Sequence, residues 1–354
     1  MVQIALLNFQ LYVVTTHISA TSNSILFKSE VPRMDTPLQI HKRKVYTTTA
    51  IGLIFLVLLI SSLLFLLGGL IFHTEFCLLN TRIEFLHYKN LQSRLKYGLQ
   101  DQGWQPIRLQ SRFGYELIGT FILNPRPSNK TIIFLHGISA TQAMGMHYVE
   151  MYLNEGYNLL IYDSRSHGAS SGACTTWGYY EKYDLDQWID WLLERNPQST
   201  IGVHGVSMGA ATALMHTALN EPSKRVKFYI ADSPYSDLTK LITQKIITYT
   251  QSQYPLWIHI LVKCASLVSY FQSDFLYEEV SPIKNLTNVT TPILYLHSEA
   301  DVIVPVEMSR ELYEATNGYR ELHTFPNIKH GRAAIDRKSE YQDIVVKFLH
   351  IVDE

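Results

Sequence analysis

The sequence Ile201-Gly202-Val203-His204-Gly205-Val206-Ser207-Met208-Gly209-Ala210 places a strand, a turn and the start of a helix within a few residues. Its β-branched and apolar beginning predicts a strand, and the small residues at 210–214 predict a helix. Between them a serine stands with glycine two residues before and two after it. Because glycine has no Cβ, neighbouring chain can pass close to a strained turn at both positions. We therefore expect the turn to lift the Ser207 hydroxyl above a sheet, beside the unpaired first amides of the helix.

The overall composition is that of a globular protein with one membrane-like segment. The chain has 354 residues and a net charge of −1, which favours no nucleic-acid partner, and no obligate protein partner is evident. Its cysteines, Cys77, Cys174 and Cys264, are too few and too scattered to predict a disulfide framework or a metal cluster. A single Cys174–Cys264 bridge stays open as an alternative.

Residues 50–72 contain no charged side chain. As a helix this segment is roughly 34 Å long, which exceeds a hydrocarbon core of about 30 Å. A cleaved signal peptide has a shorter apolar region, about 7–15 residues, that ends in a small-residue site. The sequence therefore predicts one uncleaved transmembrane helix over residues 50–72.

The charges beside this segment predict its orientation. Lys42, Arg43 and Lys44 precede it, whereas Arg82 is the only basic residue, Lys or Arg, at 73–82. The positive-inside rule then places residues 1–49 in the cytoplasm and the chain after residue 72 outside the cell. Residues 1–33 fit neither a transmembrane span nor a targeting signal. We hypothesise that translation starts at Met34, so that residues 1–33 result from a wrongly assigned start codon.

Beyond a predicted helical stalk at 73–103, residues 104–354 alternate between strand and helix patterns. We predict strands at 106–109, 117–123, 131–135, 157–162, 201–206, 226–231, 292–297 and 321–325. Continuous apolar strands separated by helical periods indicate an α/β domain, with a mostly parallel eight-stranded sheet covered by helices on both faces. Residues 235–283 interrupt the alternation and predict a small helical cap over the active site; extra surface helices are the alternative.

An activated serine needs a base, and the base needs an acid that orients it. Serines on this kind of turn are followed along the chain by the acid and then by the base. Asp301 follows the predicted strand at 292–297, and His330 follows the next one. Because the carboxyl ends of parallel strands meet at one edge of a sheet, Asp301 and His330 are the predicted acid and base.

Other residues compete for these roles. Asp232, and less strongly Glu299, could supply the acid. His323 lies within a predicted strand and is interpreted as a packed core residue. Three further histidines, His136, His167 and His204, precede or adjoin the serine, which is the wrong order for the base; the first two are expected to shape turns.

An oxyanion needs two backbone amides. One is predicted to come from Met208, directly after the serine. The other is predicted to come from Ile138, in the loop after the strand at 131–135, with Gly137 and Ser139 as alternatives.

Taken together, the motifs around these residues resemble the α/β-hydrolase superfamily. They are Leu135-His136-Gly137, Asp163-Ser164-Arg165-Ser166-His167-Gly168, Gly205-Val206-Ser207-Met208-Gly209, the loop from Asp301 to Pro305, and His330. More narrowly, the chain is similar to membrane-anchored bacterial hydrolases of the serine aminopeptidase-like group over about residues 104–350. The resemblance implies Ser207 as nucleophile, Asp301 as acid and His330 as base. Ser166 departs from it, since these proteins usually have glycine there.

The sequence thus predicts a serine hydrolase that cleaves carboxylic esters through an acyl-enzyme, without metal or organic cofactor. Its predicted partners are a small-molecule substrate, ester or peptide, and the membrane. A serine peptidase of the same fold acting on small peptides is the first alternative, and a non-catalytic surface binding module is the second.

Overall fold

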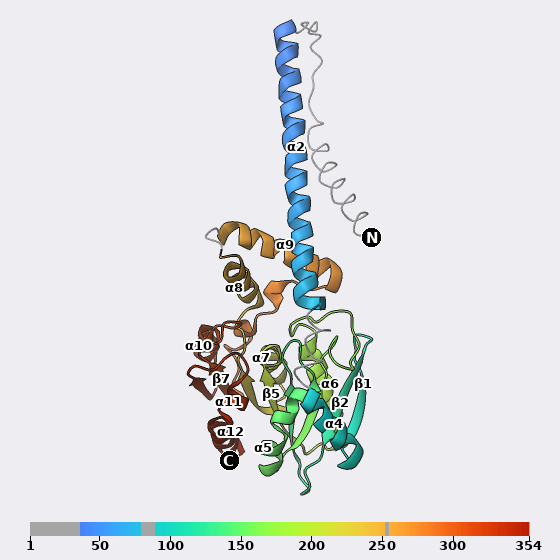
Figure 1. Cartoon of the computed structure of the whole chain (residues 1–354), viewed down its shortest axis with the longest axis vertical. Helices are drawn as coiled ribbons and strands as arrows, with labels where there is room; N and C mark the ends of the chain where they lie inside the picture. Colours follow the sequence, from blue (N-terminus) through green and yellow to red (C-terminus); the bar gives the residue numbers. More distant parts are fainter. Residues whose placement is uncertain (1–35, 79–88, 252–254, 354) are drawn as a thin grey trace. The chain divides into compact units, whose positions relative to one another are not determined.

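The computed structural model describes residues 36–78, 89–251 and 255–353 (Figure 1). The chain divides into two units, Met1–Leu59 and Ile60–Glu354, each described by itself. Helix α2 (Pro37–Phe72) begins in the first unit and ends in the second. The segment Pro37–Cys77 is long and apolar enough to cross a membrane, by length and composition. The hypothesis of a start at Met34 concerns residues outside the described ranges.

The second unit is built on one eight-stranded sheet (Figure 1). Its strands lie in the order β1-β2-β4-β3-β5-β6-β7-β8, with β1 and β2 antiparallel to their neighbours and every other pair parallel. The mostly parallel eight-stranded sheet is confirmed. The strands are β1 (Gln105–Gln110), β2 (Glu116–Ile122), β3 (Lys130–Leu135), β4 (Asn158–Tyr162), β5 (Thr200–Val206), β6 (Val226–Asp232), β7 (Ile293–Ser298) and β8 (Arg320–Phe325).

Helices cover both faces of this sheet, as predicted. Side chains alternate along each strand, so Ile132 and Phe134 of β3 enter one core cluster while Ile133 and Leu135 enter the other. The first cluster is completed by α5 (Val149–Asn154), α11 (Ala333–Asp336), α12 (Lys338–Asp353) and the 3₁₀ turn η2 (Gln142–His147). The second is completed mainly by α6 (Glu181–Arg195), α7 (Met208–Asn220) and α10 (Val306–Ala315).

The predicted cap segment forms two helices, α8 (Leu238–Thr250) and α9 (Pro255–Ser273), followed by the short 3₁₀ turns η3 (Tyr277–Glu279) and η4 (Pro282–Asn285). The cap has its own buried cluster, which includes Leu241 of α8 and Val262 of α9. Phe72 at the end of α2 and Phe76 in the π-helical turn η1 (His73–Leu78) are buried in the same cluster. The end of the apolar segment is therefore part of the cap core.

Other residues of the predicted stalk also pack on the domain. Helix α4 (Lys89–Asp101) packs against η2 and buries Leu91 in the first core cluster. Trp177 Nε1 donates a hydrogen bond to the carbonyl of Glu75 at 3.2 Å, and the Glu75 carboxylate pairs with Lys245 of α8. The described parts of 73–103 are thus attached to the domain along their length, and the predicted domain boundaries stay a prediction.

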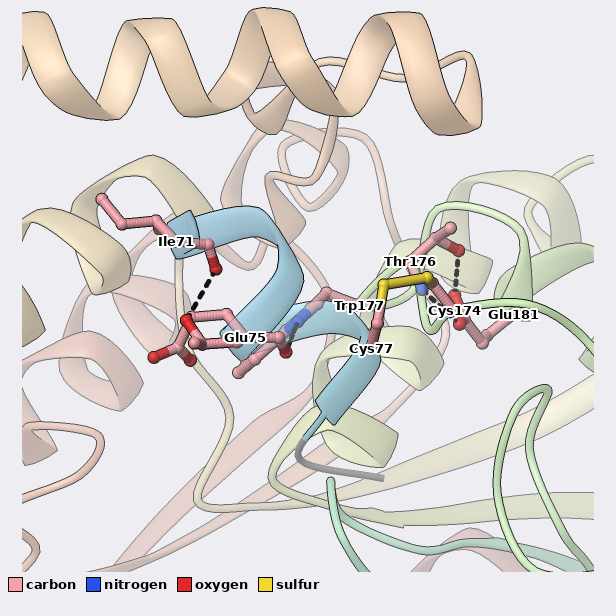
Figure 2. Close-up of a disulfide and its surroundings, with 8 residues drawn as sticks. Ile71, Glu75, Cys77, Cys174, Thr176, Trp177 and Glu181 are labelled. Carbon is pink, nitrogen blue, oxygen red and sulfur yellow. Dashed lines mark hydrogen bonds between the residues drawn. A yellow bond between two sulfur atoms is a disulfide. The ribbon is translucent and has the colours of Figure 1, made fainter. Parts of the chain in front are cut away.

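A disulfide joins Cys77 of η1 to Cys174, in the loop before α6 (Figure 2). Cys264 is the free cysteine. The alternative Cys174–Cys264 bridge is therefore wrong, because Cys174 pairs with a residue 97 positions earlier that comes just after the apolar segment. The pairing closes a large loop between the end of the predicted membrane helix and the α/β domain.

We expect loss of this disulfide to destabilise the domain. Replacing both Cys77 and Cys174 by serine should lower the free energy of unfolding by about 2–4 kcal/mol, because the unfolded chain regains the freedom of a long loop. Thermal unfolding of the purified full-length chain measures the change. The control is Cys264→Ser, which should leave the transition nearly unchanged; an equal effect of the two variants would argue against the bond.

Candidate active site

Ser207 lies on the turn between β5 and α7, in a backbone conformation that few residues adopt. Its φ is 55° and its ψ is −116°. The Ser207 amide donates to the carbonyl of Asp232 on the neighbouring strand at 2.7 Å, and this bond holds the turn against the sheet. Such a strained conformation persists only where surrounding contacts enforce it, as they do here.

The two glycines beside Ser207 leave room for close backbone contacts. A Cβ at Gly205 would lie 2.3 Å from the carbonyl carbon of Gly209. At Gly209 it would lie 2.3 Å from the carbonyl oxygen of Leu135 and 2.7 Å from that of His136. All three distances fall far inside van der Waals contact with backbone atoms, so the turn in this form requires glycine at each position.

Alanine at position 209 should therefore disrupt the site. We expect Gly209→Ala to cost about 2–3 kcal/mol of stability, since backbone must move to admit the methyl group. This corresponds to a fall in Tm of about 5–10 °C. The matched control is Gly69→Ala, where a Cβ meets no atom within 4 Å. Equal Tm values for the two variants would contradict the expectation.

The structure brings Ser207, His330 and Asp301 into one hydrogen-bonded row. His330 Nε2 lies 2.8 Å from Ser207 Oγ, and His330 Nδ1 lies 2.5 Å from Asp301 Oδ2. With the imidazole proton on Nδ1, the ring donates to the carboxylate and accepts the serine hydroxyl proton. This is the arrangement of nucleophile, base and orienting acid that the sequence predicts.

The loop after β7 holds Asp301 in its ionised form. Asp301 Oδ1 accepts hydrogen bonds from the amides of Ile303 and Val304, each at 2.9 Å. Burial opposes the charge, but hydrogen bonds from His297 and His330 outweigh it and hold the pKa of Asp301 well below its usual range. Asp301 is therefore a carboxylate throughout the neutral pH range and can stabilise a protonated His330.

His297 is a site residue that the sequence analysis missed. It is the fifth residue of β7, fully buried, and its Nε2 lies 3.3 Å from Asp301 Oδ2. Its Nδ1 lies 2.6 Å from Ser309 Oγ, and Nε2 also lies 2.9 Å from the carbonyl of Val304. His297 Nε2 therefore lies beside Oδ2, the same carboxylate oxygen that binds His330 Nδ1. The sequence feature that could have indicated this role is a histidine in an otherwise apolar strand, four residues before the predicted acid.

The competing acids, Asp232 and Glu299, form side-chain hydrogen bonds to groups other than His330. Asp232 accepts from the hydroxyls of Ser233 at 2.8 Å and Tyr341 at 3.1 Å, and burial raises its pKa. Glu299 accepts from Thr324 at 2.7 Å. The interpretation of His323 as a packed core residue is wrong: β8 is an edge strand, and the half-buried His323 pairs with Glu321 at 2.9 Å.

Two histidines fix the loops beside the serine. His136 Nδ1 donates to the Gly137 carbonyl at 2.7 Å, and its Nε2 accepts from the amide of Ser164 at 2.9 Å. His167 accepts similarly from the amide of Ser139 at 3.3 Å. Burial lowers the pKa of each histidine to about 4, so both are neutral near pH 7 and can accept these bonds.

The remaining histidine and the departure from the family pattern also have structural explanations. His204 is buried between the hydroxyls of Tyr152, at 2.7 Å, and Tyr341, at 3.0 Å. Ser166 has a φ of 61°, in the left-handed region that favours glycine. Ser166 therefore adopts a backbone conformation that favours glycine, the residue that the resemblance leads us to expect there.

The predicted oxyanion residues lie on either side of Ser207. Met208 is the first residue of α7, and Ile138 lines the same cavity as Ser207. A Cβ at Gly137 would lie 3.3 Å from Ser207 Cβ, which places this loop directly against the serine. The Ser139 amide is already bonded to His167, which leaves Ile138 the better candidate. The oxyanion role of both amides stays a prediction.

Ser207 and His330 open into a cavity of about 680 Å³. Most of its lining is apolar, and α4 contributes Asn90 and Leu91 to the wall. The sequence predicts that α4 belongs to a stalk and that the cap covers the site. Instead α4 forms part of the cavity wall, and no described residue of 235–283 lines the cavity. The apolar lining residues are Leu91, Ile138, Ala140, Met144, Val206, Ile303 and Ile335.

Comparison with known proteins agrees with this architecture. Residues 148–352 match the model of the prolyl oligopeptidase family. The protein YqkD of Bacillus subtilis is 31% identical over 242 residues, which cover 68% of this chain and 77% of YqkD. The lysophosphatidylserine lipase ABHD12 of Macaca fascicularis is 24% identical over 204 residues, 56% of this chain and 48% of the lipase. The chain therefore spans about half the length of this lipase.

Among solved structures, the chain is similar to the esterase Pf2001 of Pyrococcus furiosus. The TM-score is 0.56 and the identity 28%, with 70% of this chain and 90% of the esterase covered. These likenesses and the eight-stranded sheet confirm the α/β-hydrolase superfamily. The chain is thus a hydrolase of this fold, and it belongs to the prolyl oligopeptidase family.

Proposed function

We propose that the protein is a serine hydrolase that cleaves carboxylic esters through a covalent acyl-enzyme. The observation that carries this proposal is the continuous row Ser207–His330–Asp301 at the base of a cavity of about 680 Å³. A serine hydroxyl is a weak nucleophile by itself, and a bonded imidazole that is oriented by a carboxylate activates it.

In the proposed reaction, His330 accepts the Ser207 proton as Oγ attacks the ester carbonyl carbon. The tetrahedral oxyanion is stabilised by the amides of Ile138 and Met208. His330 then donates its proton to the leaving alcohol, and the C–O bond breaks to leave an acyl group on Ser207. Water, deprotonated by His330, attacks this acyl group and releases the carboxylic acid.

The cavity lining favours an ester of an apolar acid over a free peptide. Seven apolar side chains can contact an acyl chain. None of the lining residues, all within the described part of the chain, carries a carboxylate that could bind the ammonium of a peptide N-terminus. The membership of the prolyl oligopeptidase family is the observation that favours the alternative, a serine peptidase.

A substrate series separates the two functions. p-Nitrophenyl esters with acyl chains of increasing length are compared with aminoacyl and peptidyl anilides, using the purified full-length chain and Ser207→Ala as the blank. We expect kcat/KM to rise about three- to fourfold per methylene until the cavity is filled. Faster cleavage of the anilides than of every ester would favour the peptidase instead.

We further propose that α2 anchors the protein in the cell membrane with the hydrolase domain outside. The basic residues before the apolar segment support this orientation. The disulfide between Cys77 and Cys174 supports it too, because such bonds persist mainly in oxidising compartments. A membrane-impermeant fluorophosphonate should label wild-type protein on intact cells and fail to label Ser207→Ala. Labelling only after lysis would reverse the orientation.

A further inference from the structure

Helix α9 exposes an unusual number of large apolar side chains. Six of them are between 39% and 75% exposed: Leu256, Trp257, Ile260, Leu267, Tyr270 and Phe271. Four of these, at positions 256, 260, 267 and 271, fall within one narrow stripe of an α-helix. The only Lys or Arg on the helix is Lys263, at the edge of the stripe.

The opposite side of α9 is apolar as well. Ile258, Val262, Ala265 and Val268 are buried in the cap cluster. The exposed stripe is therefore not the polar outer face that a helix on a water-soluble domain normally presents. A helix that is apolar on both sides is expected to have a second apolar environment.

The contacts of α9 within the second unit show where it lies along α2. A Cβ at Gly68 would lie 2.8 Å from the backbone nitrogen of Ala265, so the two helices touch at backbone distance there. The rings of Phe65 and Phe271 lie 6.4 Å apart. Phe65 and Gly68 both belong to the predicted membrane span, 50–72.

These contacts indicate how far α9 lies from the end of the predicted membrane span. Gly68 and Phe65 precede the last residue of the span by four and seven residues, which is about 6 and 10 Å at 1.5 Å per residue. Amphipathic helices that lie in a membrane surface are buried by about 5–10 Å. The ammonium of Lys263 can reach lipid phosphates from the edge of the stripe.

We propose that α9 lies in the surface of the lipid bilayer, with the stripe of Leu256, Ile260, Leu267 and Phe271 among the acyl chains. The inference rests on the membrane anchoring proposed above. It places the cap at the membrane surface. The cap is close to the catalytic cavity, because Ile138 lines that cavity and also packs against the cap cluster. The second apolar environment of α9 is thus lipid.

Environment-sensitive fluorophores measure this directly. In the full-length Cys264→Ser chain, with the native disulfide kept oxidised, single cysteines replace Ile260 and Phe271 and are labelled with NBD. Leu63→Cys on α2 reports the anchor, and Gln198→Cys reports an exposed surface position. Each protein is reconstituted in phosphatidylcholine vesicles with or without a lipid that carries a nitroxide on its acyl chain. Fluorophosphonate labelling of Ser207 verifies that each variant is folded.

We expect positions 260 and 271 to be quenched at least half as strongly as position 63, and position 198 to be unaffected. If 63 is quenched while 260 and 271 behave like 198, α9 faces water and the inference fails, although the anchor stands. If none is quenched, the anchor itself fails. Blue-shifted emission at 260 and 271 without lipid quenching would mean that protein, such as a second copy of the chain, covers the stripe, and would overturn the inference.

Discussion

Ser207→Ala should lower ester hydrolysis by about 10⁴- to 10⁶-fold, because the variant lacks the hydroxyl that we propose forms the acyl-enzyme. The loss should appear in kcat, since the cavity that binds the substrate keeps its lining. Burst experiments with a chromogenic ester should show one equivalent of product per wild-type chain and none for the variant.

The Ser207→Ala variant also has to keep its fold. Ser207 is buried and its φ of 55° is strained, so alanine occupies the same conformation at similar cost. Its Tm should therefore lie close to that of the wild type. Residual turnover within tenfold of wild type, in a preparation free of other esterases, would mean that Ser207 is not the nucleophile.

Asp301→Asn should lower kcat by about 10⁴-fold, which is about 5 kcal/mol of transition-state stabilisation. The amide group of asparagine can donate to His330 Nδ1, so it favours the tautomer whose Nε2 carries the proton. That nitrogen then cannot accept the proton of Ser207 Oγ, which lies 2.8 Å away. The charge that stabilises protonated His330 is lost as well.

Glu299→Gln is the matched control for this prediction. Glu299 lies in the same loop, two residues before the acid, but its carboxylate binds Thr324 and not His330. We expect its kcat to stay within about threefold of wild type, since surface changes away from a site have small effects. Similar losses in Asp301→Asn and Glu299→Gln would show that the loop, and not the Asp301 carboxylate, determines the rate.

The sheet could be predicted because its local and long-range signals agree. Strand β5 has six buried residues out of seven and its parallel neighbour β3 has five out of six, and their sequences are rich in the apolar residues that strands buried on both faces require. The turn at Ser207 was predictable for the same reason, because its close backbone contacts require glycine at positions 205 and 209. Asp301 and His330 followed from their positions after two successive strands.

The parts that escaped prediction depend on contacts between distant segments. Cys77 directly follows the apolar segment, and nothing local indicates that it reaches Cys174, 97 positions away. The sequence around Asn90 and Leu91 predicts only a helical stalk, and it does not indicate that these two residues line the cavity. His297 looks like a strand residue, and its contact with Asp301 exists only because the loop after β7 folds back on that strand.

The exposed apolar face of α9 could not be predicted for a different reason. Its sequence predicted a cap helix from Ile, Leu, Trp and Tyr, and the helix forms. Which of these residues are buried depends on the cap cluster, to which distant residues such as Phe72 and Phe76 also belong. Composition alone could not separate the two faces of a helix that is apolar on both.

The central claim, that His330 and Asp301 activate Ser207, is tested most directly by a fluorophosphonate. The full-length wild-type chain is treated with the reagent, digested and mapped by mass spectrometry, beside Ser207→Ala and Asp301→Asn. We predict one phosphonyl adduct, on Ser207, formed much more slowly in Asp301→Asn and absent in Ser207→Ala. An unmodified Ser207 in folded wild-type protein, or an adduct on another serine that persists in Ser207→Ala, would contradict the account.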